Sequence, residues 1–171
     1  MKIIYSNENY SSLETNSLFL AGPTPRSKDV KSWRPEALEF LKNSGFTGTV
    51  LVPEFSSWEV QFDYDNQVQW EFQGLMNCGK IVFWIPSDEK DMPALTTRTE
   101  FGMFMALRPK DVIYGRPKDA WKLNYLDWWY NKITDTNPVD NLQDTLTRAM
   151  YYAVSSFAKA CEPKQYFKGN K

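Results

Sequence analysis

Histidine is absent from the 171-residue sequence, and cysteine occurs only at Cys78 and Cys161. The chain therefore has no Ser-His-Asp or Cys-His catalytic group, no imidazole metal ligand and no CxxC redox or zinc motif. Any acid-base or nucleophilic chemistry must use carboxylates, tyrosine, lysine or cysteine. Two distant cysteines form no disulfide framework, which indicates a reducing compartment.

An excess of positive charge and long apolar runs are also missing from the sequence. Lys and Arg number 20 against 21 Asp and Glu, so the net charge is −1, and the basic excess of a nucleic-acid-binding protein is missing. No apolar run approaches the ~20 residues of a membrane span, and the first eight residues contain no signal-peptide core. We expect a cytoplasmic protein with no nucleic-acid or membrane partner.

Aromatic residues, in contrast, make up 16% of the chain. A core together with an oligomer interface explains such a content, and so does a pocket that stacks planar rings. Core packing is favoured for each of the candidates for stacking, which are Tyr10, Trp33, Trp58 and Tyr64.

Short apolar runs alternate with amphipathic stretches. Strands are predicted at residues 18–21, 49–52, 81–85 and 111–114, and each stops at a glycine or proline. Helices are predicted at residues 35–45, 67–78, 97–107, 118–132 and about 140–160. This order predicts an α/β fold: one domain over residues 1–171, with a parallel sheet between helices on both faces, a core at about 17–132 and an extra C-terminal helix.

In parallel sheets of this kind, ligands bind outside the carboxyl ends of the strands. Polar residues follow three of the predicted strands there. They are Gly22, Pro23, Thr24 and Arg26 after the first strand, Glu54 after the second, and Ser87, Asp88 and Asp91 after the third.

Glu100 lies at the predicted start of a helix, in the segment from Thr96 to Gly102. Thr97 and Glu100 fit a capping box, a purely structural role. Alternatively, the helix dipole holds the Glu100 carboxylate ionised, as a nucleophile requires, and Gly102 leaves room for a ligand.

Glu71 stands between aromatic residues on a predicted helix. Most such glutamates face solvent. If Glu71 instead faces the cleft, apolar neighbours would raise its pKa and suit it to be an acid. A raised-pKa acid and an ionised nucleophile are the pair that retaining glycosyl chemistry uses.

Several motifs together resemble the nucleoside 2-deoxyribosyltransferase-like family. The resemblance extends from about Leu18 to Tyr125 and rests on residues 18–23, 33–37, 52–54, 70–71, 81–86 and 96–102. It implies a flavodoxin-like or Rossmann-like domain that forms homo-oligomers. It also implies a reaction in which Glu100 attacks C1′ of a 2′-deoxynucleoside, the base leaves, and a second base takes the deoxyribosyl group. This reaction requires no cofactor or metal.

The resemblance also implies roles for further residues. Glu71 would exchange a proton with the base, Glu54 would contact the base, and Asp91 or Asp88 would hold the sugar hydroxyls. The remaining positions are Gly22 and Pro23 in the loop near the nucleoside, Arg98 beside a 5′-phosphate or in solvent, and Asn124 as the asparagine lent to a neighbouring subunit.

The chain departs from the family at two positions. Leu18 and Phe19 stand where the transferases have a tyrosine, and Cys78-Gly79-Lys80 replaces a segment with an aspartate. Cys78 itself is expected to be a buried structural residue.

Four functions therefore stay open. The first is a deoxyribosyltransferase acting on a nucleoside and a free base. The second is a hydrolase of nucleosides or nucleotides, for which residues 24, 26, 27 and 96–98 offer a phosphate pocket. The third is a non-catalytic module that binds a nucleotide or an ADP-ribose-like metabolite. The fourth is an interaction protein that uses the aromatic segment 121–130.

Overall fold

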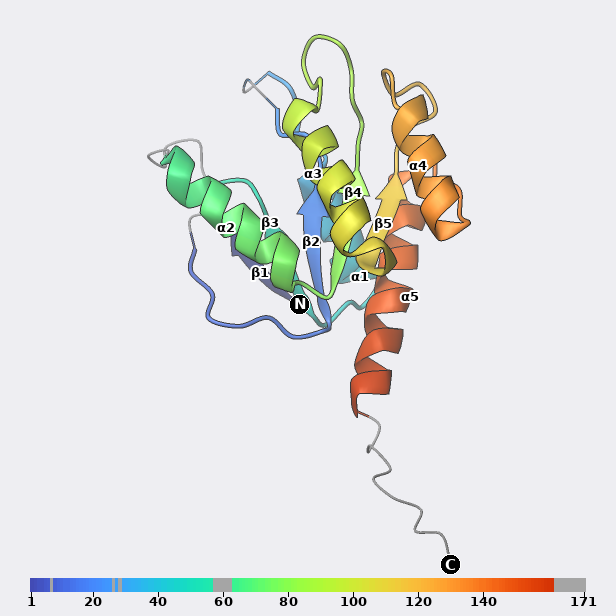
Figure 1. Cartoon of the computed structure of the whole chain (residues 1–171). Helices are drawn as coiled ribbons and strands as arrows, with labels where there is room; N and C mark the ends of the chain where they lie inside the picture. The colour runs from blue at the N-terminus through green and yellow to red at the C-terminus, as the bar shows by residue number, and fades with distance from the viewer. Residues whose placement is uncertain (7, 26, 28, 57–62, 162–171) are drawn as a thin grey trace, which may run out of the picture.

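A computed structural model describes residues 1–6, 8–25, 27, 29–56 and 63–161, and only the backbone of residues 156–161. This part of the chain contains five strands and five α-helices, and strands and helices alternate from β2 to α4 (Figure 1). The strands are β1 (Lys2–Tyr5), β2 (Ser17–Ala21), β3 (Thr49–Val52), β4 (Lys80–Trp84) and β5 (Val112–Gly115). The helices are α1 (Arg34–Asn43), α2 (Tyr64–Asn77), α3 (Leu95–Leu107), α4 (Asn124–Thr134) and α5 (Leu142–Cys161), and a short 3₁₀ turn covers Pro109–Asp111.

The strands form one sheet in the order β1-β3-β2-β4-β5, and every pairing is parallel. From β2 the chain first moves outward to β3 and then returns to the other side of β2 to form β4. The strand order therefore reverses between β2 and β4, and a crevice opens at their carboxyl ends. This arrangement confirms the predicted α/β, flavodoxin-like fold.

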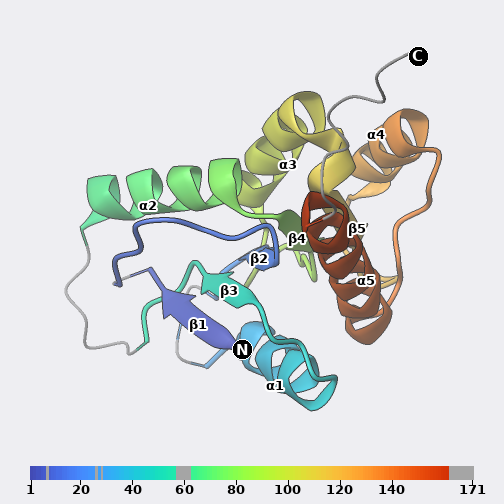
Figure 2. The same cartoon turned by 90° about the horizontal axis from the view of Figure 1, so that it is seen from below.

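Side chains alternate between the two faces of the sheet, as strand geometry requires. Phe19, Ile81 and Phe83 point to the face covered by α2, α3 and α4. Leu18 and Val82 point to the face covered by α1 and α5. Figure 2 shows these two helical layers on opposite sides of the sheet, with α2 beside α3.

The predicted strands match β2, β3, β4 and β5 to within one residue at each end. Helices α2 and α3 begin three and two residues earlier than predicted, and two larger differences concern β1 and α4. Strand β1, at the edge of the sheet, has no counterpart among the predicted strands. Helix α4 begins at Asn124 rather than at 118, because Lys122 adopts a left-handed backbone (φ 49°) that interrupts the helical path.

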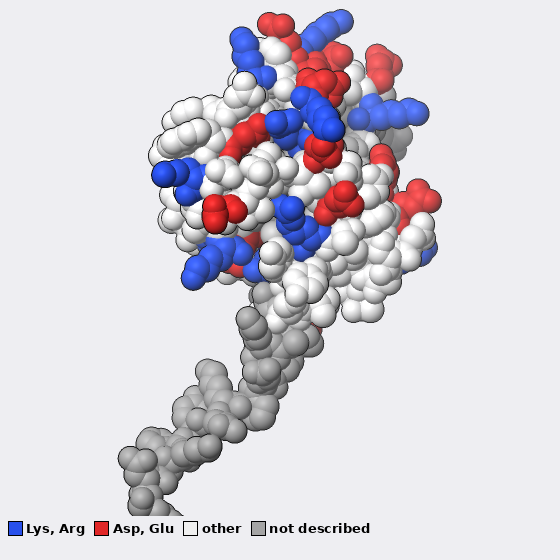
Figure 3. Space-filling view, turned by 90° about the vertical axis from the view of Figure 1, so that its right-hand side faces the viewer, with Lys and Arg blue, Asp and Glu red and all other residues white. Residues whose placement is uncertain are grey.

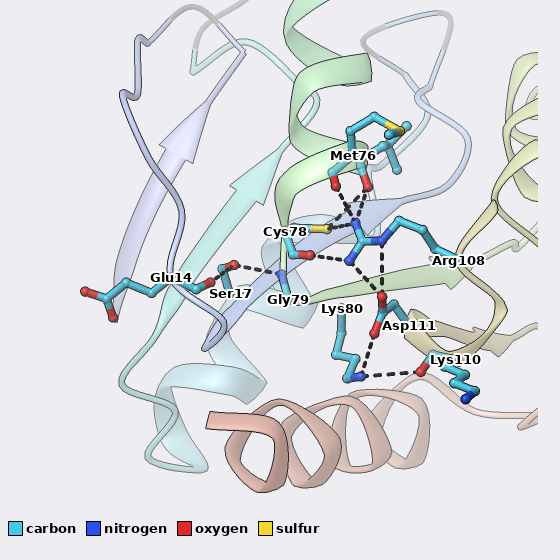
Figure 4. A network of polar contacts seen from close by, with 10 residues as sticks. Glu14, Ser17, Met76, Cys78, Gly79, Lys80, Arg108, Lys110 and Asp111 are labelled. Carbon is cyan, nitrogen blue, oxygen red and sulfur yellow. Dashed lines mark hydrogen bonds and ion pairs between the residues drawn. The ribbon is translucent and has the colours of Figure 1, made fainter. Parts of the chain in front are cut away.

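Arg108 links the carboxyl end of α2 to the turn before β5 through hydrogen bonds and an ion pair (Figure 4). Its guanidinium donates to the carbonyls of Leu75 at 2.6 Å and Cys78 at 2.6 Å, and it pairs with Asp111 at 2.9 Å. These carbonyls are ones that a helix end leaves without helical partners. Cys78 is 1% exposed, which confirms its predicted burial, and burial raises the pKa of its thiol to about 12.

Candidate active site

A cavity of about 240 Å³ lies at the carboxyl ends of the central strands, between α2 and α3. The loop after β2 contributes Gly22, Pro23 and Thr24, α2 contributes Gln67 and Glu71, and the first turns of α3 contribute Thr97 and Glu100. The fold thus brings together four predicted site residues: Gly22, Pro23, Glu71 and Glu100.

Gly22 is required by the close approach of the backbone at this crevice. A Cβ atom at this position would lie 2.2 Å from the carbonyl oxygen of Trp84 and 2.8 Å from the Trp33 ring. Only glycine therefore lets the loop after β2 pass so near the end of β4.

Glu100 lies in the second turn of α3, so the capping-box interpretation is wrong. The residue before the helix is Ala94, with a left-handed backbone (φ 56°) and no side-chain cap, and Thr97 is inside the first turn. The helix dipole acts mainly within that first turn. The pKa of Glu100 is raised to about 7: burial is the largest cause, the charge of Glu71 also raises it, and the charge of Arg34 lowers it.

Glu71 faces the same cavity from the middle of α2. Burial raises its pKa, while a 2.8 Å hydrogen bond from Nε2 of Gln67 and the charge of Arg34 act in the opposite direction. The expected raised pKa is therefore confirmed. The charge of Glu71 raises the pKa of Glu100. Two neighbouring carboxyl groups of this kind favour a state in which the pair shares one proton.

Arg34 is the functional candidate that the sequence analysis missed. It lines the cavity yet is only 1% exposed. Its guanidinium donates to the carbonyls of Leu20 (3.0 Å) and Gly22 (2.7 Å) and forms an ion pair with Glu54 at 2.5 Å. One buried cation therefore shapes the loop after β2 and supplies positive charge to both glutamates.

Glu54 is placed differently from its predicted role. Its carboxylate accepts hydrogen bonds from Arg34 and, at 2.8 Å, from Ser32. It is not among the residues that line the cavity. The structure therefore shows Glu54 as the partner of Arg34, and contact with a base stays a prediction.

Asp88 and Asp91 also lie away from the cavity lining. The Asp88 carboxylate accepts hydrogen bonds from the backbone N–H groups of Lys90, Asp91 and Met92, which close the turn after β4. These bonds, led by that from Asp91, lower the pKa of Asp88. Asp91 is exposed. Sugar binding by either aspartate stays a prediction.

Arg98 joins α3 to the chain before α4. It donates to the carbonyls of Pro93 (3.2 Å), Trp121 (2.8 Å) and Lys122 (2.7 Å). Its guanidinium is thus committed to backbone carbonyls, which argues against a 5′-phosphate at this position. Asn124 is exposed at the start of α4 and does not line the cavity.

The aromatic candidates have different positions. Trp33 is buried against Gly22 and donates to the carbonyl of Pro23 at 3.3 Å, which is a packing role. Tyr64 is 65% exposed and lines the cavity, and Tyr10 lies outside it. Trp58 and Arg26 fall outside the described residues.

Gly102 does not make room in the glutamate cavity. It lines a separate hollow between α3 and α4, and a Cβ there would meet no atom within 4 Å. Among the described residues, no cluster of carboxylates and cysteines is arranged to hold a metal ion. Nor is any described helix both long and apolar enough to cross a membrane.

The family model described as "Nucleoside 2-deoxyribosyltransferase like" matches residues 15–119, which is more than half of the chain. The chain belongs to this family. The match confirms the resemblance and contains all the residues that line the glutamate cavity. No curated protein matches the sequence. The family indicates an enzyme of the glycosyl transferase or hydrolase type with a nucleoside or base as its small-molecule substrate.

Proposed function

We propose that this deoxyribosyltransferase-like protein cleaves the N-glycosidic bond of a 2′-deoxynucleoside and transfers the deoxyribosyl group to a second base. The observation that carries the proposal is the pair of glutamates, Glu71 and Glu100, in one cavity at the topological switch point of the sheet. Both have raised pKa values, and the largest cause for each is the partial burial of its carboxyl group.

Burial and the charge of Glu71 favour the shared proton on Glu100, so the reactive state for the first half of the reaction is the one in which that proton has moved to Glu71. An oxygen of the ionised Glu100 attacks C1′ and forms a C–O bond. The C1′–N bond breaks, its electron pair stays with the base, and Glu71 gives its proton to a ring nitrogen or carbonyl oxygen of the base. The deoxyribosyl group is then held covalently on Glu100.

In the second half, an acceptor base replaces the first. The Glu71 carboxylate removes a proton from the acceptor as its nitrogen attacks C1′, and the C–O bond to Glu100 breaks. Configuration at C1′ is retained because it is inverted twice. Water in place of the acceptor would give hydrolysis. A nucleoside is favoured over a nucleotide because Arg34 and Arg98, the described cations in or beside this region, are committed to carbonyls and to Glu54.

The test incubates the protein with 2′-deoxynucleosides and with their 5′-monophosphates, each with and without a different free base, and separates the products by chromatography. A new nucleoside that forms only with the acceptor is expected. Release of free base in the absence of an acceptor would show that the protein is a hydrolase rather than a transferase. If every substrate returns intact while nucleosides still bind, the protein is a binding module.

Mass spectrometry of the denatured protein provides the second readout. A deoxyribosyl adduct is expected on the peptide that contains Glu100, and Glu100→Gln should abolish both adduct and turnover. Glu39→Gln, an exposed position on α1, is the matched control and should keep full activity. An adduct on another peptide would overturn the role of Glu100.

A further inference from the structure

A larger hollow of about 830 Å³ lies beside the glutamate cavity, between α2 and the segment that joins β1 to β2. We call it the amide groove, and its lining includes Ser6, Asn9, Gln67 and Gln73 together with the rings of Tyr10 and Trp70. Among its described lining residues there is no lysine or arginine, and the single carboxylate, Asp63, caps the start of α2.

Two polar atoms in this groove are buried without a hydrogen-bond partner. They are Oγ of Ser6 and Oε1 of Gln67, two of the three such side-chain atoms in the described part of the chain. The orientation of the Gln67 amide is fixed because its Nε2 donates to Glu71 at 2.8 Å. Its oxygen is therefore an oriented acceptor for an N–H or O–H group. Burial of an acceptor is unfavourable unless it receives a hydrogen bond.

The two rings of the groove are also held in place. The Trp70 indole donates to the carbonyl of Glu8 at 2.9 Å, the Tyr10 hydroxyl donates to the carbonyl of Trp70 at 3.2 Å, and the ring centroids lie 5.6 Å apart. Fixed aromatic surfaces beside amides suit a flat polar ligand. The lack of a described cation argues against a phosphate.

Gln67 lines both hollows, so it is the wall that they share. The glutamate cavity, at about 240 Å³, is smaller than the ~300–1,000 Å³ of typical ligand sites. A substrate that does not fit within the glutamate cavity could therefore extend past Gln67, one helical turn before Glu71 on α2, into the amide groove.

We propose that the amide groove binds a free nucleobase, an uncharged planar heterocycle whose N–H group donates to Oε1 of Gln67. This inference rests on the proposed function, because it supplies the place from which an acceptor base approaches Glu71. Ser6, which lines only the groove, provides the second hydrogen bond.

The test measures binding of adenine, cytosine, thymine and hypoxanthine by calorimetry, with deoxyribose and deoxyribose 5-phosphate as competitors. Glu100→Gln serves as the background so that no turnover occurs. At least one base is expected to bind, with an affinity about tenfold weaker after Gln67→Met and several-fold weaker after Ser6→Ala, each from the loss of one hydrogen bond.

Matched controls are available on α5. Gln143 also donates through Nε2 to a glutamate, Glu36, at 2.7 Å, and Ser155 donates to the carbonyl of Tyr151, but both lie outside the groove. Gln143→Met and Ser155→Ala should leave base affinity unchanged. Thermal unfolding of every variant identifies any that lose the fold.

Base binding that is absent, or unaffected by both Gln67→Met and Ser6→Ala in folded variants, would overturn the inference, as would a preference for deoxyribose over every base. If the protein cleaves deoxynucleosides but binds no free base, the assignment of the groove as a base site is overturned and the proposed function stays intact. Base binding that depends on Gln67 and Ser6, in a protein that cleaves no deoxynucleoside, would support the groove as a base site and overturn the proposed function.

Discussion

At the residue scale, the interaction between Glu71 and Glu100 leads to a direct prediction. The charge of Glu71 contributes to the raised pKa of Glu100, so its removal should lower that pKa below about 7. We expect Glu71→Gln to shift the Glu100 titration to lower pH in ¹³C NMR of the side-chain carboxyl groups. Glu39→Gln is the control that should leave it in place. An unchanged titration would show that the two carboxylates do not interact.

Arg34 leads to the second prediction. Lysine keeps the charge but lacks the planar fork that reaches Leu20, Gly22 and Glu54 at once. We expect Arg34→Lys to lower the free energy of unfolding by about 2–4 kcal/mol, since buried partners lose their hydrogen bonds. Turnover should fall as well, even at temperatures where the variant is folded.

The control for that substitution is Arg148→Lys, because Arg148 donates to the carbonyl of Asn137 at a more accessible position on α5. Urea unfolding and activity assays on both variants provide the comparison. If Arg34→Lys and Arg148→Lys have equal free energies of unfolding, the hydrogen bonds of Arg34 are not needed to hold the loop after β2.

The sequence predicted part of the site, because strand ends identify the edge of the sheet where polar residues gather. It assigned an acid and a nucleophile to Glu71 and Glu100 and contact roles to Glu54 and Asp88, but it did not show that only the first two face the cavity. All four are acidic residues near that edge, and their hydrogen-bond partners depend on the folded loops. A signal for Arg34 existed in its position directly before Pro35, at the start of a helix.

At the scale of elements, Arg108 has a structural role that can be measured. It holds the last carbonyls of α2, the helix that carries Glu71. We expect Arg108→Met to destabilise the protein by about 1–3 kcal/mol and to speed hydrogen exchange in the last turn of α2. Lys118→Met, which breaks an exposed ion pair with Asp140, should cost less than ~1 kcal/mol. Equal effects would exclude the capping role.

Elements with strong sequence signals were predicted well, and the misses have local causes. The four predicted strands each end at a glycine or proline, whereas β1 is a short run at the chain start with no such boundary. The start of α3 was misplaced because Ala94, not a polar capping residue, precedes it. That error of two residues moved Glu100 from the first helical turn to the second, which changes the cause of its pKa.

At the scale of the whole molecule, the exposed aromatic face of α4 supports the expected homo-oligomer. Tyr125, Trp128 and Trp129 are 69%, 55% and 39% exposed. On the face that Figure 3 shows, basic and acidic residues are mixed, so no area of a single sign opposes association there. Large exposed aromatic groups of this kind are typical of interfaces.

We predict that the protein sediments at a mass above its 20.0 kDa monomer at micromolar concentration. Trp128→Ser combined with Trp129→Ser should shift it toward the monomer, because the buried aromatic area would be lost. Tyr151→Ser, at an exposed aromatic on α5, is the control and should leave the mass unchanged. A monomeric wild-type protein would contradict the prediction.

The raised pKa of Glu100 also determines how the stability of the whole molecule depends on pH. In the folded state this pKa is about 7, against an ordinary value of 4.5, so between these pH values the folded protein holds a proton that the unfolded chain releases. The stability that this proton contributes to the folded state is complete below pH 4.5 and is lost as pH rises to about 7. Glu71, whose pKa is also raised, acts with the same sign. The two glutamates therefore lower the stability of the folded protein at neutral pH.

Glu100→Gln should remove most of this dependence. We expect the variant to be about 1–2 kcal/mol more stable than the wild type at pH 8 and equally stable near pH 4. Urea unfolding across that range measures the difference, and Glu39→Gln should follow the wild-type curve. A variant less stable than the wild type at pH 8 would show that the Glu100 carboxylate is stabilised by its surroundings, which is incompatible with the burial that raises its pKa.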